Sequence, residues 1–248
     1  MDHSPGCLHI VSVPIGNMGD ITLRAIEVLQ QADTIICEDL KPARRLLHEL
    51  SLLKKEGVGG WSEKPLLPLN EHTEASATEE GIQLLRSGKN LALISDAGTP
   101  LVADPGQRLV RRAIEEGIEV SPVPGASSIL AALVVSGFRS DTFYFAGMLP
   151  REKPERKKAA RALAARAETI VLLEAPYRLP QLLDDLVDGF GKDRHACIAM
   201  NLSLPAERVD RGTLLALRDL FAARPFKGEF VVVIEGRRTS ASSRKDAD

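Results

Sequence analysis

The chain has 248 residues, of which 44% are hydrophobic and 27% are charged, values typical of a globular protein in water. No apolar stretch reaches the roughly 20 residues that span a bilayer, and the N-terminus lacks the basic and apolar regions of a signal peptide, so we expect a cytoplasmic protein without a membrane segment. The formal net charge of −2 excludes an overall electrostatic attraction to nucleic acid, but it leaves a local basic patch open.

The first half of the chain alternates short apolar runs with helical patterns, which indicates an α/β fold with a largely parallel sheet. We predict strands at residues 8–14, 34–37 and 90–94. Helices are expected where a capping side chain or a proline suits the first turn: at Asp20, at Pro42, at Ser76 with Glu79, and at Asp104 with Pro105. Gly117 should end the last of these helices, and residues 54–70 should be irregular.

The segment SPVPGAS, residues 121–127, is the predicted joint between two domains, because its prolines stiffen the chain before a further helix. After it the alternation of apolar runs and helical patterns restarts and continues to the run EFVVVIEG. We therefore predict two α/β domains, residues 1–121 and 122–236. Residues 237–248 contain almost nothing apolar and are expected to form a disordered tail.

Cysteine and histidine usage gives no sign of a metal site. The three cysteines have no Cys-x-x-Cys pairing, and each lies in or beside an apolar, strand-like run. The five histidines are scattered without the spacing of metal ligands. We expect neither a bound metal nor a redox site.

Three loops rich in glycine or proline stand at the carboxyl ends of predicted strands: VPIGNMGD at 13–20, SDAGTP at 95–100 and PVPGAS at 122–127. Ligands of open α/β sheets bind beyond these ends. None of the loops has the glycine pattern of a phosphate-binding loop. Each loop alone is consistent with an ordinary turn, whereas three together indicate a cofactor cleft lined by closely approaching backbone.

The stretches VPIGNMGDITLRAIEVL, ICED, NEHTE, SDAGTP, PVPGASSILAAL and KGEFVVVIEG follow one another over nearly the whole chain. Together they closely resemble the tetrapyrrole-methylase-like class of S-adenosylmethionine-dependent methyltransferases. Within that class they look most like the branch that 2′-O-methylates a cytidine of small-subunit ribosomal RNA. The resemblance implies two α/β domains, S-adenosylmethionine in a cleft between them, and a homodimer.

The resemblance also implies which residues bind the methyl donor, with backbone groups doing most of the recognition and Asp96 as a polar anchor. In the first domain these residues are Pro14, Gly16, Asp96, Ala97, Gly98, Thr99, Ala126 and Ser127. In the second domain they are Glu174, Met200, Asn201, Gly228 and Glu229. For the glycines, turn geometry without a ligand contact is the alternative, and helix initiation alone explains Gly106.

The second half of the chain departs from the pattern of the RNA branch. That branch usually carries an arginine–glutamate–leucine–threonine–lysine segment after the strand that matches CIAM. Here Asn201 stands near the expected acid and Leu204 near the expected lysine. The changes leave the methyltransferase class intact but keep two alternatives open. The first is a porphyrinoid-ring C-methyltransferase or a divergent relative with another acceptor, and the second is a non-catalytic ribosome-binding protein.

Methylation of a ribose hydroxyl requires a group that removes the hydroxyl proton. Candidates in the first domain are Glu38, Asp39, Glu71 and His72, and the RNA branch usually has an acidic–histidine motif similar to Glu71–His72. Contacts to RNA phosphates require lysine and arginine. Residues 151–168 supply Arg151, Lys153, Arg156, Lys157, Lys158, Arg161 and Arg166, for which a solvated helix face is the alternative.

Overall fold

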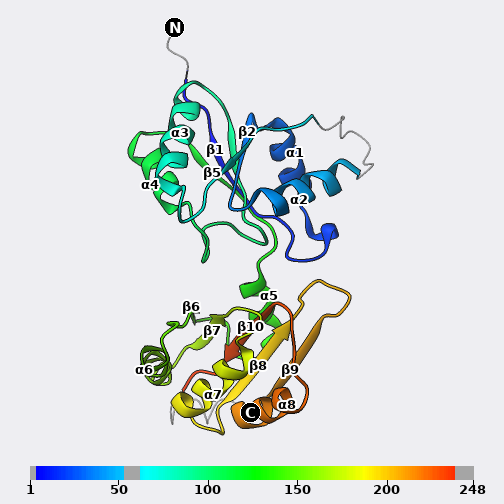
Figure 1. Ribbon diagram of the computed structural model, residues 1–248, viewed down its shortest axis with the longest axis vertical. Coiled ribbons are helices and arrows are strands. Elements are labelled where there is room, and N and C mark those ends of the chain that lie inside the picture. Colours follow the sequence, from blue (N-terminus) through cyan, green and yellow to red (C-terminus); the bar gives the residue numbers. More distant parts are fainter. Residues whose placement is uncertain (1–3, 53–61, 238–248) are drawn as a thin grey trace. The chain divides into compact units, whose positions relative to one another are not determined.

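The computed structural model describes residues 4–52 and 62–237. Within them the chain forms two compact units, and each unit is a β-sheet covered by α-helices (Figure 1). The predicted fold class, two α/β domains, is confirmed.

The described part of the first unit contains a five-stranded parallel sheet with the strand order β3-β2-β4-β1-β5. Its strands are β1 (Leu8–Val11), β2 (Thr34–Cys37), β3 (Leu66–Pro68), β4 (Leu91–Leu93) and β5 (Val120–Val123). Leu8 of β1 pairs with Leu91 on one side and with Val120 on the other, so β1 is an inner strand. Because the strands are parallel, their carboxyl ends share one side of the sheet, here called the first carboxyl edge.

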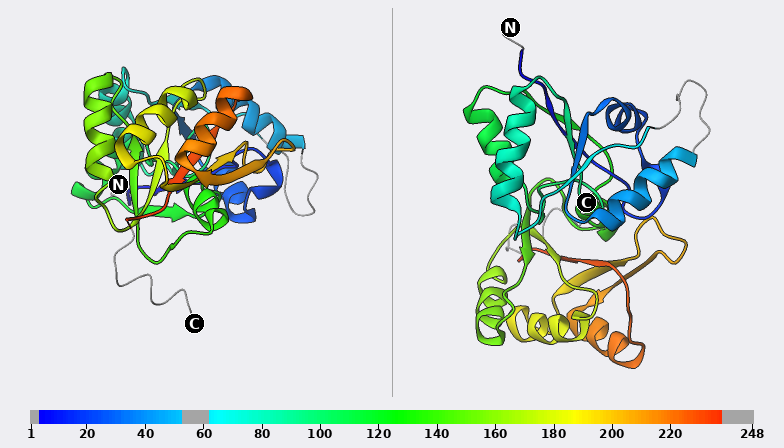
Figure 2. Two further views of the ribbon diagram at one scale, coloured as in Figure 1. Left: turned by 90° about the horizontal axis from the view of Figure 1, so that it is seen from below. Right: turned by 45° about the horizontal axis from the view of Figure 1, so that its top comes forward.

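Helices cover both faces of this sheet: α1 (Leu23–Gln31), α2 (Leu40–Leu52), α3 (Glu74–Arg86) and α4 (Gln107–Glu115). Figure 2 (right) shows α3 and α4 side by side on one face, and α1 and α2 on the other. Successive strand residues point to opposite faces. Ile35 and Cys37 therefore pack in the core under α1 and α2, while Ile36 packs in the core under α3 and α4.

Three of the predicted helix starts are wrong, and each helix has another N-cap. Thr22 caps α1 by accepting a hydrogen bond from Ala25 N at 3.1 Å, because Asp20 lies in the preceding 3₁₀ turn η1 (Met18–Asp20). Thr73 precedes α3, so Ser76 is already inside the helix. Gly106 precedes α4, and the predicted cap Asp104 remains in the loop. In contrast, Pro42 lies in the first turn of α2, and Gly117 follows α4 with a φ of +70°.

The described part of the second unit contains a five-stranded mixed sheet with the order β6-β7-β10-β8-β9. Its strands are β6 (Phe143–Met148), β7 (Thr169–Leu173), β8 (His195–Met200), β9 (Arg208–Thr213) and β10 (Phe230–Ile234). β10 runs antiparallel to both of its neighbours, pairing Val231 with Leu173 and Phe230 with Met200. The ends of β7 and β8 therefore lie beside the start of β10, at what is here called the second edge.

The helices of the second unit are α5 (Ser128–Ser136), α6 (Lys153–Leu163), α7 (Leu179–Phe190) and α8 (Leu214–Ala223). Residues of α6, α7 and α8 form one apolar core with the sheet residues Ile170, Ile198 and Val232. The opposite face is contacted by α5, which lies against β8 and β10. Helices thus contact both faces of the inner strands β8 and β10, which explains why the sequences of these two strands are largely hydrophobic.

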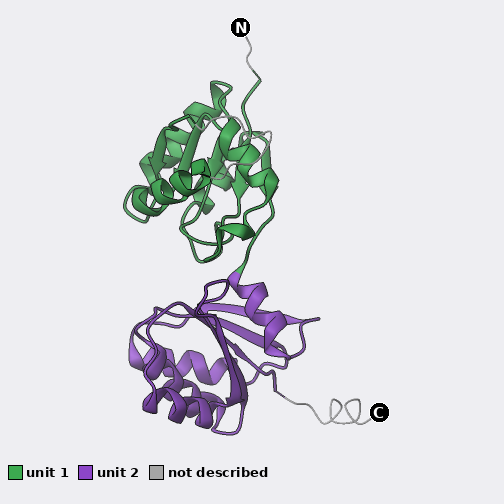
Figure 3. Ribbon diagram, turned by 90° about the vertical axis from the view of Figure 1, so that its right-hand side faces the viewer, with its two compact units in different colours: residues 1–127 green, residues 128–248 purple. Residues whose placement is uncertain are grey.

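Two strands and one boundary differ from the sequence prediction. β3 falls inside the stretch predicted to be irregular, and no strand was predicted at β9. The first unit ends at Ser127 rather than at Ser121, because β5 pairs with β1 and thus belongs to the first sheet (Figure 3). Of the predicted tail, only Arg237 is described, and its backbone N donates to Arg166 O at 2.8 Å; the rest lies outside the described residues, as do residues 54–61.

Among the described helices, none combines the length and the hydropathy that a membrane crossing needs. Cys37 and Cys197 are buried, and burial is the main reason why the pKa of each thiol rises to about 11. Both thiols are therefore protonated at neutral pH and behave as small core residues.

Candidate active site

The three loops predicted from the sequence meet at the first carboxyl edge. Val13 N donates to Gly98 O at 2.9 Å, and Gly98 N donates back to Val13 O at 3.2 Å. Ser12 N donates to Val123 O at 3.1 Å, which joins the same segment to β5. The segment after β1 is thus held between the loop after β4 and the end of β5.

Thr99 ties all three loops together through its hydroxyl group. Its Oγ1 donates to Ala126 O at 3.0 Å and lies 3.0 Å from the Ser12 hydroxyl. Ser95 Oγ donates to Gly98 O at 3.1 Å within the loop after β4. The side chain of Thr99 therefore holds the edge in shape, and its hydroxyl has little capacity left for a ligand.

Two glycines permit the close approach of these loops. Gly98 has a φ of +82°, and a Cβ atom there would lie 3.2 Å from Ile15 Cγ2 and 3.7 Å from Ala126 O. A Cβ atom at Gly125 would lie 2.9 Å from the Cβ of Ser12. At both positions a larger residue would push the loops apart, so packing requires both glycines, and at Gly98 the positive φ favours glycine as well.

The remaining first-unit residues predicted to bind the donor lie on the same segments. Pro14 is buried, whereas Gly16, Asp96 and Ala97 are exposed at the edge. Ala126 and Ser127 are half-buried just after β5. The structure thus brings these residues together, with the Asp96 carboxylate and several backbone groups available to a ligand.

The loop from Gly98 to Gly106 has an unusual backbone. Besides these two glycines, Leu101 and Ala103 have positive φ values of 70° and 68°. Such conformations are costly for residues with a side chain and persist where the surroundings enforce them, often at functional sites. Gly106, with a φ of +115°, also donates its N–H to Glu74 Oε1 at 3.2 Å, so it does more than start α4.

Carboxylates from three strand ends gather beside this loop: Glu38, Asp39, Glu71, Asp96 and Asp104. Burial is the main reason why the pKa of Glu38 and that of Asp96 are raised, and neighbouring carboxylates add to the rise. Burial, followed by the charges of Glu38 and Asp96, raises the pKa of Asp104 to about 6. Glu38, Asp96 and Asp104 therefore bind protons more readily than isolated carboxylates do.

The raised pKa of Asp104 predicts a pH-dependent stability. Asp104 binds its proton more tightly in the folded protein than in the unfolded chain, so its contribution is complete below about pH 4 and is lost as the pH rises through about 6. Because the side chain is partly exposed to solvent, we expect this loss to reach at most about 1–2 kcal/mol. Asp104→Asn should reduce the loss, as measured by denaturant midpoints between pH 4 and pH 7.

The control for this measurement is Asp193→Asn, which changes an exposed aspartate of the second unit. It should reproduce the pH dependence of the parent protein. Parallel pH profiles for the parent and Asp104→Asn would contradict the expected proton uptake at Asp104.

Glu71 and His72 are exposed in the turn between β3 and α3. His72 N donates to the Asn70 side chain at 3.0 Å, which fixes the backbone of this turn. The charge of Glu71 contributes to the raised pKa of Glu38, so Glu71 lies near the carboxylate group described above. Both predicted catalytic residues thus stand beside the first carboxyl edge.

The predicted donor-binding residues of the second unit lie along the second edge. Glu174 follows β7, Asn201 follows β8, and Gly228 and Glu229 precede β10. Asn201 N donates to Glu229 O at 2.9 Å. A Cβ atom at Gly228 would lie only 2.5 Å from Asn201 Oδ1, so this glycine leaves room for the asparagine side chain.

Two residues of this set are buried. Met200 is fully buried, and its side chain is part of the apolar core of the second unit. Glu174 is 4% exposed and lies 3.4 Å from Arg178 Nη1, and its Oε1 accepts from Ala175 N at 2.9 Å. The carboxylate of Glu174 is thus compensated within the unit.

The basic segment at residues 151–168 supplies fewer free cations than predicted. Arg156 is buried and lies 2.5 Å from Asp185, Lys157 lies 2.6 Å from Asp188, and Arg166 stacks 3.7 Å over the ring of Tyr144. These three residues stabilise the second unit, which the sequence pattern did not reveal. Arg151, Lys153, Lys158 and Arg161 remain as candidates for phosphate contacts. In the described parts of the chain, no group of three His, Cys, Asp or Glu side chains has a metal-binding arrangement.

The profile of the family described as "Tetrapyrrole (Corrin/Porphyrin) Methylases" matches residues 7–218 of the chain. A protein named "Ribosomal RNA small subunit methyltransferase I" from Mesorhizobium japonicum is 42% identical over 242 residues, which are 97% of this chain and 79% of that protein. The protein of the same name from Xylella fastidiosa is 42% identical over 94% of this chain and 82% of its own length.

Solved structures with much lower identity share the fold. Diphthine synthase superposes with a TM-score of 0.70 at 17% identity, over 97% of this chain and 94% of that chain. Uroporphyrin-III-C-methyltransferase from Thermus thermophilus superposes with a TM-score of 0.61 at 22% identity, over 93% and 94% of the two chains. At these identities the likeness concerns the fold alone.

Proposed function

Because the chain belongs to the tetrapyrrole (corrin/porphyrin) methylase family and, within it, to the ribosomal RNA small subunit methyltransferase I family, we propose that it methylates the 2′-oxygen of a cytidine in small-subunit ribosomal RNA. The chain is a methyltransferase that uses S-adenosylmethionine. The observation that carries the choice of substrate is the 42% identity over 97% of the chain to a relative with that name.

S-adenosylmethionine fits the first carboxyl edge by its chemistry. The donor has few charges and many groups that pair with backbone amides and carbonyls, and the edge exposes the small residues Gly16 and Ala97 beside the paired and buried Gly98. The exposed Asp96 carboxylate would take a hydroxyl or ammonium group of the donor. Gly16, Ala97, Ala126 and Ser127 would surround it, with Thr99 holding the loops.

The bound donor supplies an electrophilic methyl group on a sulfonium. Transfer is an in-line displacement, so the protein contributes mainly by orienting both reactants and excluding water. The attacking ribose hydroxyl must lose a proton to a neighbouring base as the new O–C bond forms. We assign this role to the Glu71–His72 pair, which stands beside the first carboxyl edge and near Glu38.

Substitution of the proposed base should slow methyl transfer without loss of the donor. We expect His72→Ala or Glu71→Gln to lower kcat by about 10²-fold or more, the usual contribution of a general base, and to change its pH profile. The affinity for S-adenosylmethionine, measured by calorimetry, should stay the same. His48→Ala and Glu80→Gln are exposed on α2 and α3 and serve as matched controls. An unchanged kcat in both test variants would remove the pair from the mechanism.

The two other functions considered from the sequence have less support. Porphyrinoid methylases such as uroporphyrin-III-C-methyltransferase share the fold at 22% identity, against 42% for the relatives named as ribosomal RNA methyltransferases. A non-catalytic ribosome-binding protein would not need to retain the interlocked glycine loops of the first carboxyl edge. We also propose that the enzyme is a cytoplasmic homodimer, which sedimentation would distinguish from a monomer of 26.9 kDa.

The deciding experiment supplies labelled S-adenosylmethionine and small ribosomal subunits from a strain that lacks this gene, and maps the label. We expect one methyl group, on a cytidine 2′-oxygen. An RNA complex with several phosphate contacts should also weaken steeply with salt, whereas an apolar ring substrate should not. Label on a porphyrinoid, or no label on ribosomal RNA while the donor binds normally, would overturn the proposal.

A further inference from the structure

A polar groove of about 320 Å³ lies between α3 and α4, on the outer surface of the first unit. It is lined by Thr78 of α3 and by Arg108, Arg111, Arg112 and Glu115 of α4. Three arginine residues thus line one small hollow. None of these residues belongs to the loops of the first carboxyl edge.

The Thr78 hydroxyl is the second feature of this groove. The residue is only 1% exposed, and its Oγ1 makes no hydrogen bond to any residue that the structure describes. A buried hydroxyl without a partner is costly and uncommon in folded proteins, so it calls for an explanation. A ligand atom bound in the groove would supply the missing partner.

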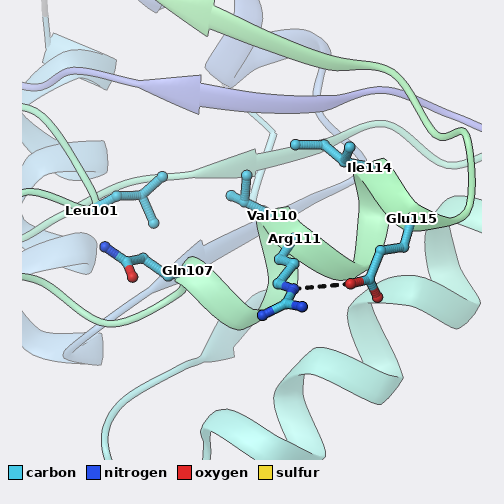
Figure 4. Close-up of a pocket in the computed structure, with 6 residues that line it drawn as sticks. All are labelled: Leu101, Gln107, Val110, Arg111, Ile114 and Glu115. Atoms are coloured by element: carbon cyan, nitrogen blue, oxygen red, sulfur yellow. Dashed lines mark hydrogen bonds and ion pairs between the residues drawn. The ribbon is translucent and has the colours of Figure 1, made fainter.

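The arginines differ in how firmly they are held. Arg108 makes no ion pair with the described residues. Arg111 lies 2.9 Å from Glu115 (Figure 4). Both side chains of this ion pair are exposed to solvent, so the pair is weak. Arg112 is held in place by Glu116 at 2.6 Å and by Glu79 at 3.6 Å. Within the described part of the chain, one guanidinium is thus free, one is easily released and one is fixed.

We propose that this groove binds the oxygens of a phosphate group, donated by the backbone of the RNA substrate. The inference rests on the proposed function for the source of the phosphate. Guanidinium groups bind phosphate through paired, charge-assisted hydrogen bonds, and a threonine hydroxyl donates one more. Glu115 competes with the phosphate for Arg111, so on binding the phosphate replaces the Glu115 carboxylate as the ion-pair partner of Arg111. The contact positions the RNA and is independent of its base sequence.

The first test measures binding of small ribosomal subunits to variants of the full chain. Thr78→Val keeps the shape of the side chain but removes the donor, so we expect affinity to fall about fivefold, the effect of one hydrogen bond, while the melting temperature stays equal or rises. Arg108→Ala should weaken binding about tenfold and lower the salt slope by about 0.7–0.9, as expected for one lost phosphate contact. Glu115→Gln should strengthen binding. Arg45→Ala removes an exposed arginine of α2 and is the matched control.

The second test separates the sources of the phosphate. Inorganic phosphate is titrated while the Nε–H resonance of Arg108 is followed by NMR, in the parent protein and in Thr78→Val. Saturable shifts that weaken in the variant, together with weakened RNA binding, support the proposal. Phosphate binding without any effect on RNA would overturn the RNA assignment, and no phosphate-dependent shift would overturn the site itself.

The outcome is distinguishable from a failure of the proposed function. If the parent protein binds S-adenosylmethionine but methylates no ribosomal RNA, the substrate assignment fails, and the phosphate titration still reports on the groove. If the parent methylates the RNA while Thr78→Val and Arg108→Ala keep its KM, the groove proposal fails alone. In the expected case both variants raise KM for the RNA and leave kcat at saturating RNA unchanged.

Discussion

Asp185→Ala should destabilise the second unit by about 3–5 kcal/mol, because it leaves the Arg156 guanidinium buried without its counter-charge. The two side chains are 8% and 3% exposed and join α6 to α7 through a contact of 2.5 Å. Arg156 Nη1 also donates to Arg151 O at 2.6 Å, but a carbonyl cannot replace the lost carboxylate charge. The loss is measured as a shift of the denaturant midpoint, followed by circular dichroism.

The neighbouring pair Lys157–Asp188 joins the same two helices at 2.6 Å but is open to solvent, so Asp188→Ala should change the midpoint little. The double variant Arg156→Met, Asp185→Leu replaces the buried charges by apolar side chains of similar size and should recover most of the stability. A small effect of Asp185→Ala would mean that water reaches Arg156 readily. In that case Arg156 would again be a candidate for contacts with RNA phosphates.

Gly98→Val should lower the affinity for S-adenosylmethionine by about 100-fold or more, since a β-branched residue is a genuine outlier at a positive φ and its side chain would enter the contact between the loops. The new Cβ atom would already lie 3.2 Å from Ile15 Cγ2, and the valine methyl groups would add to that crowding. Separation of the loops would displace the backbone groups proposed to hold the donor. Titration calorimetry measures the affinity.

The matched control is Gly117→Val. Gly117 also has a positive φ of +70°, but a Cβ atom there would have no atom of the described residues within 4 Å. Both variants carry the backbone cost of a left-handed residue, which is about 1–2 kcal/mol. Only Gly98→Val should lose the donor. Equal donor affinities in the two variants would show that the first carboxyl edge is not where S-adenosylmethionine binds.

The core elements were predictable because their apolar residues follow the periods of strands and helices. β1, β2 and β4 lie within the three predicted strands, and β10 lies within the predicted apolar run EFVVVIEG. β3 and β9 were missed for physical reasons: β3 spans only three residues, and β9 is an outer strand of its sheet, where few side chains need to be apolar. Pro68 at the end of β3 and the charged residues Arg208, Asp210 and Arg211 in β9 suit such outer positions.

Helix starts and side-chain pairing depended on tertiary contacts that local patterns do not contain. Asp20, Ser76 and Asp104 are all good capping residues, yet in each case a residue two or three positions away takes the position before the helix. Likewise, nothing in the basic run around Arg156 indicates that Asp185 lies against it. The gathering of the three loops was predictable, since the carboxyl ends of parallel strands share one edge.

The strand order of the first unit also determines when that unit can fold during synthesis. β1 leaves the ribosome first, but its partners β4 and β5 come much later in the chain. Until Val123 has emerged, β1 has at most one of its two neighbours, and its unpaired edge is open to wrong partners. The ribosome must therefore translate the whole first unit before the loops around Gly98 can close on one another. A nascent chain that ends before β5 should remain sensitive to protease, and one that extends past Ser127 and clears the exit tunnel should become resistant.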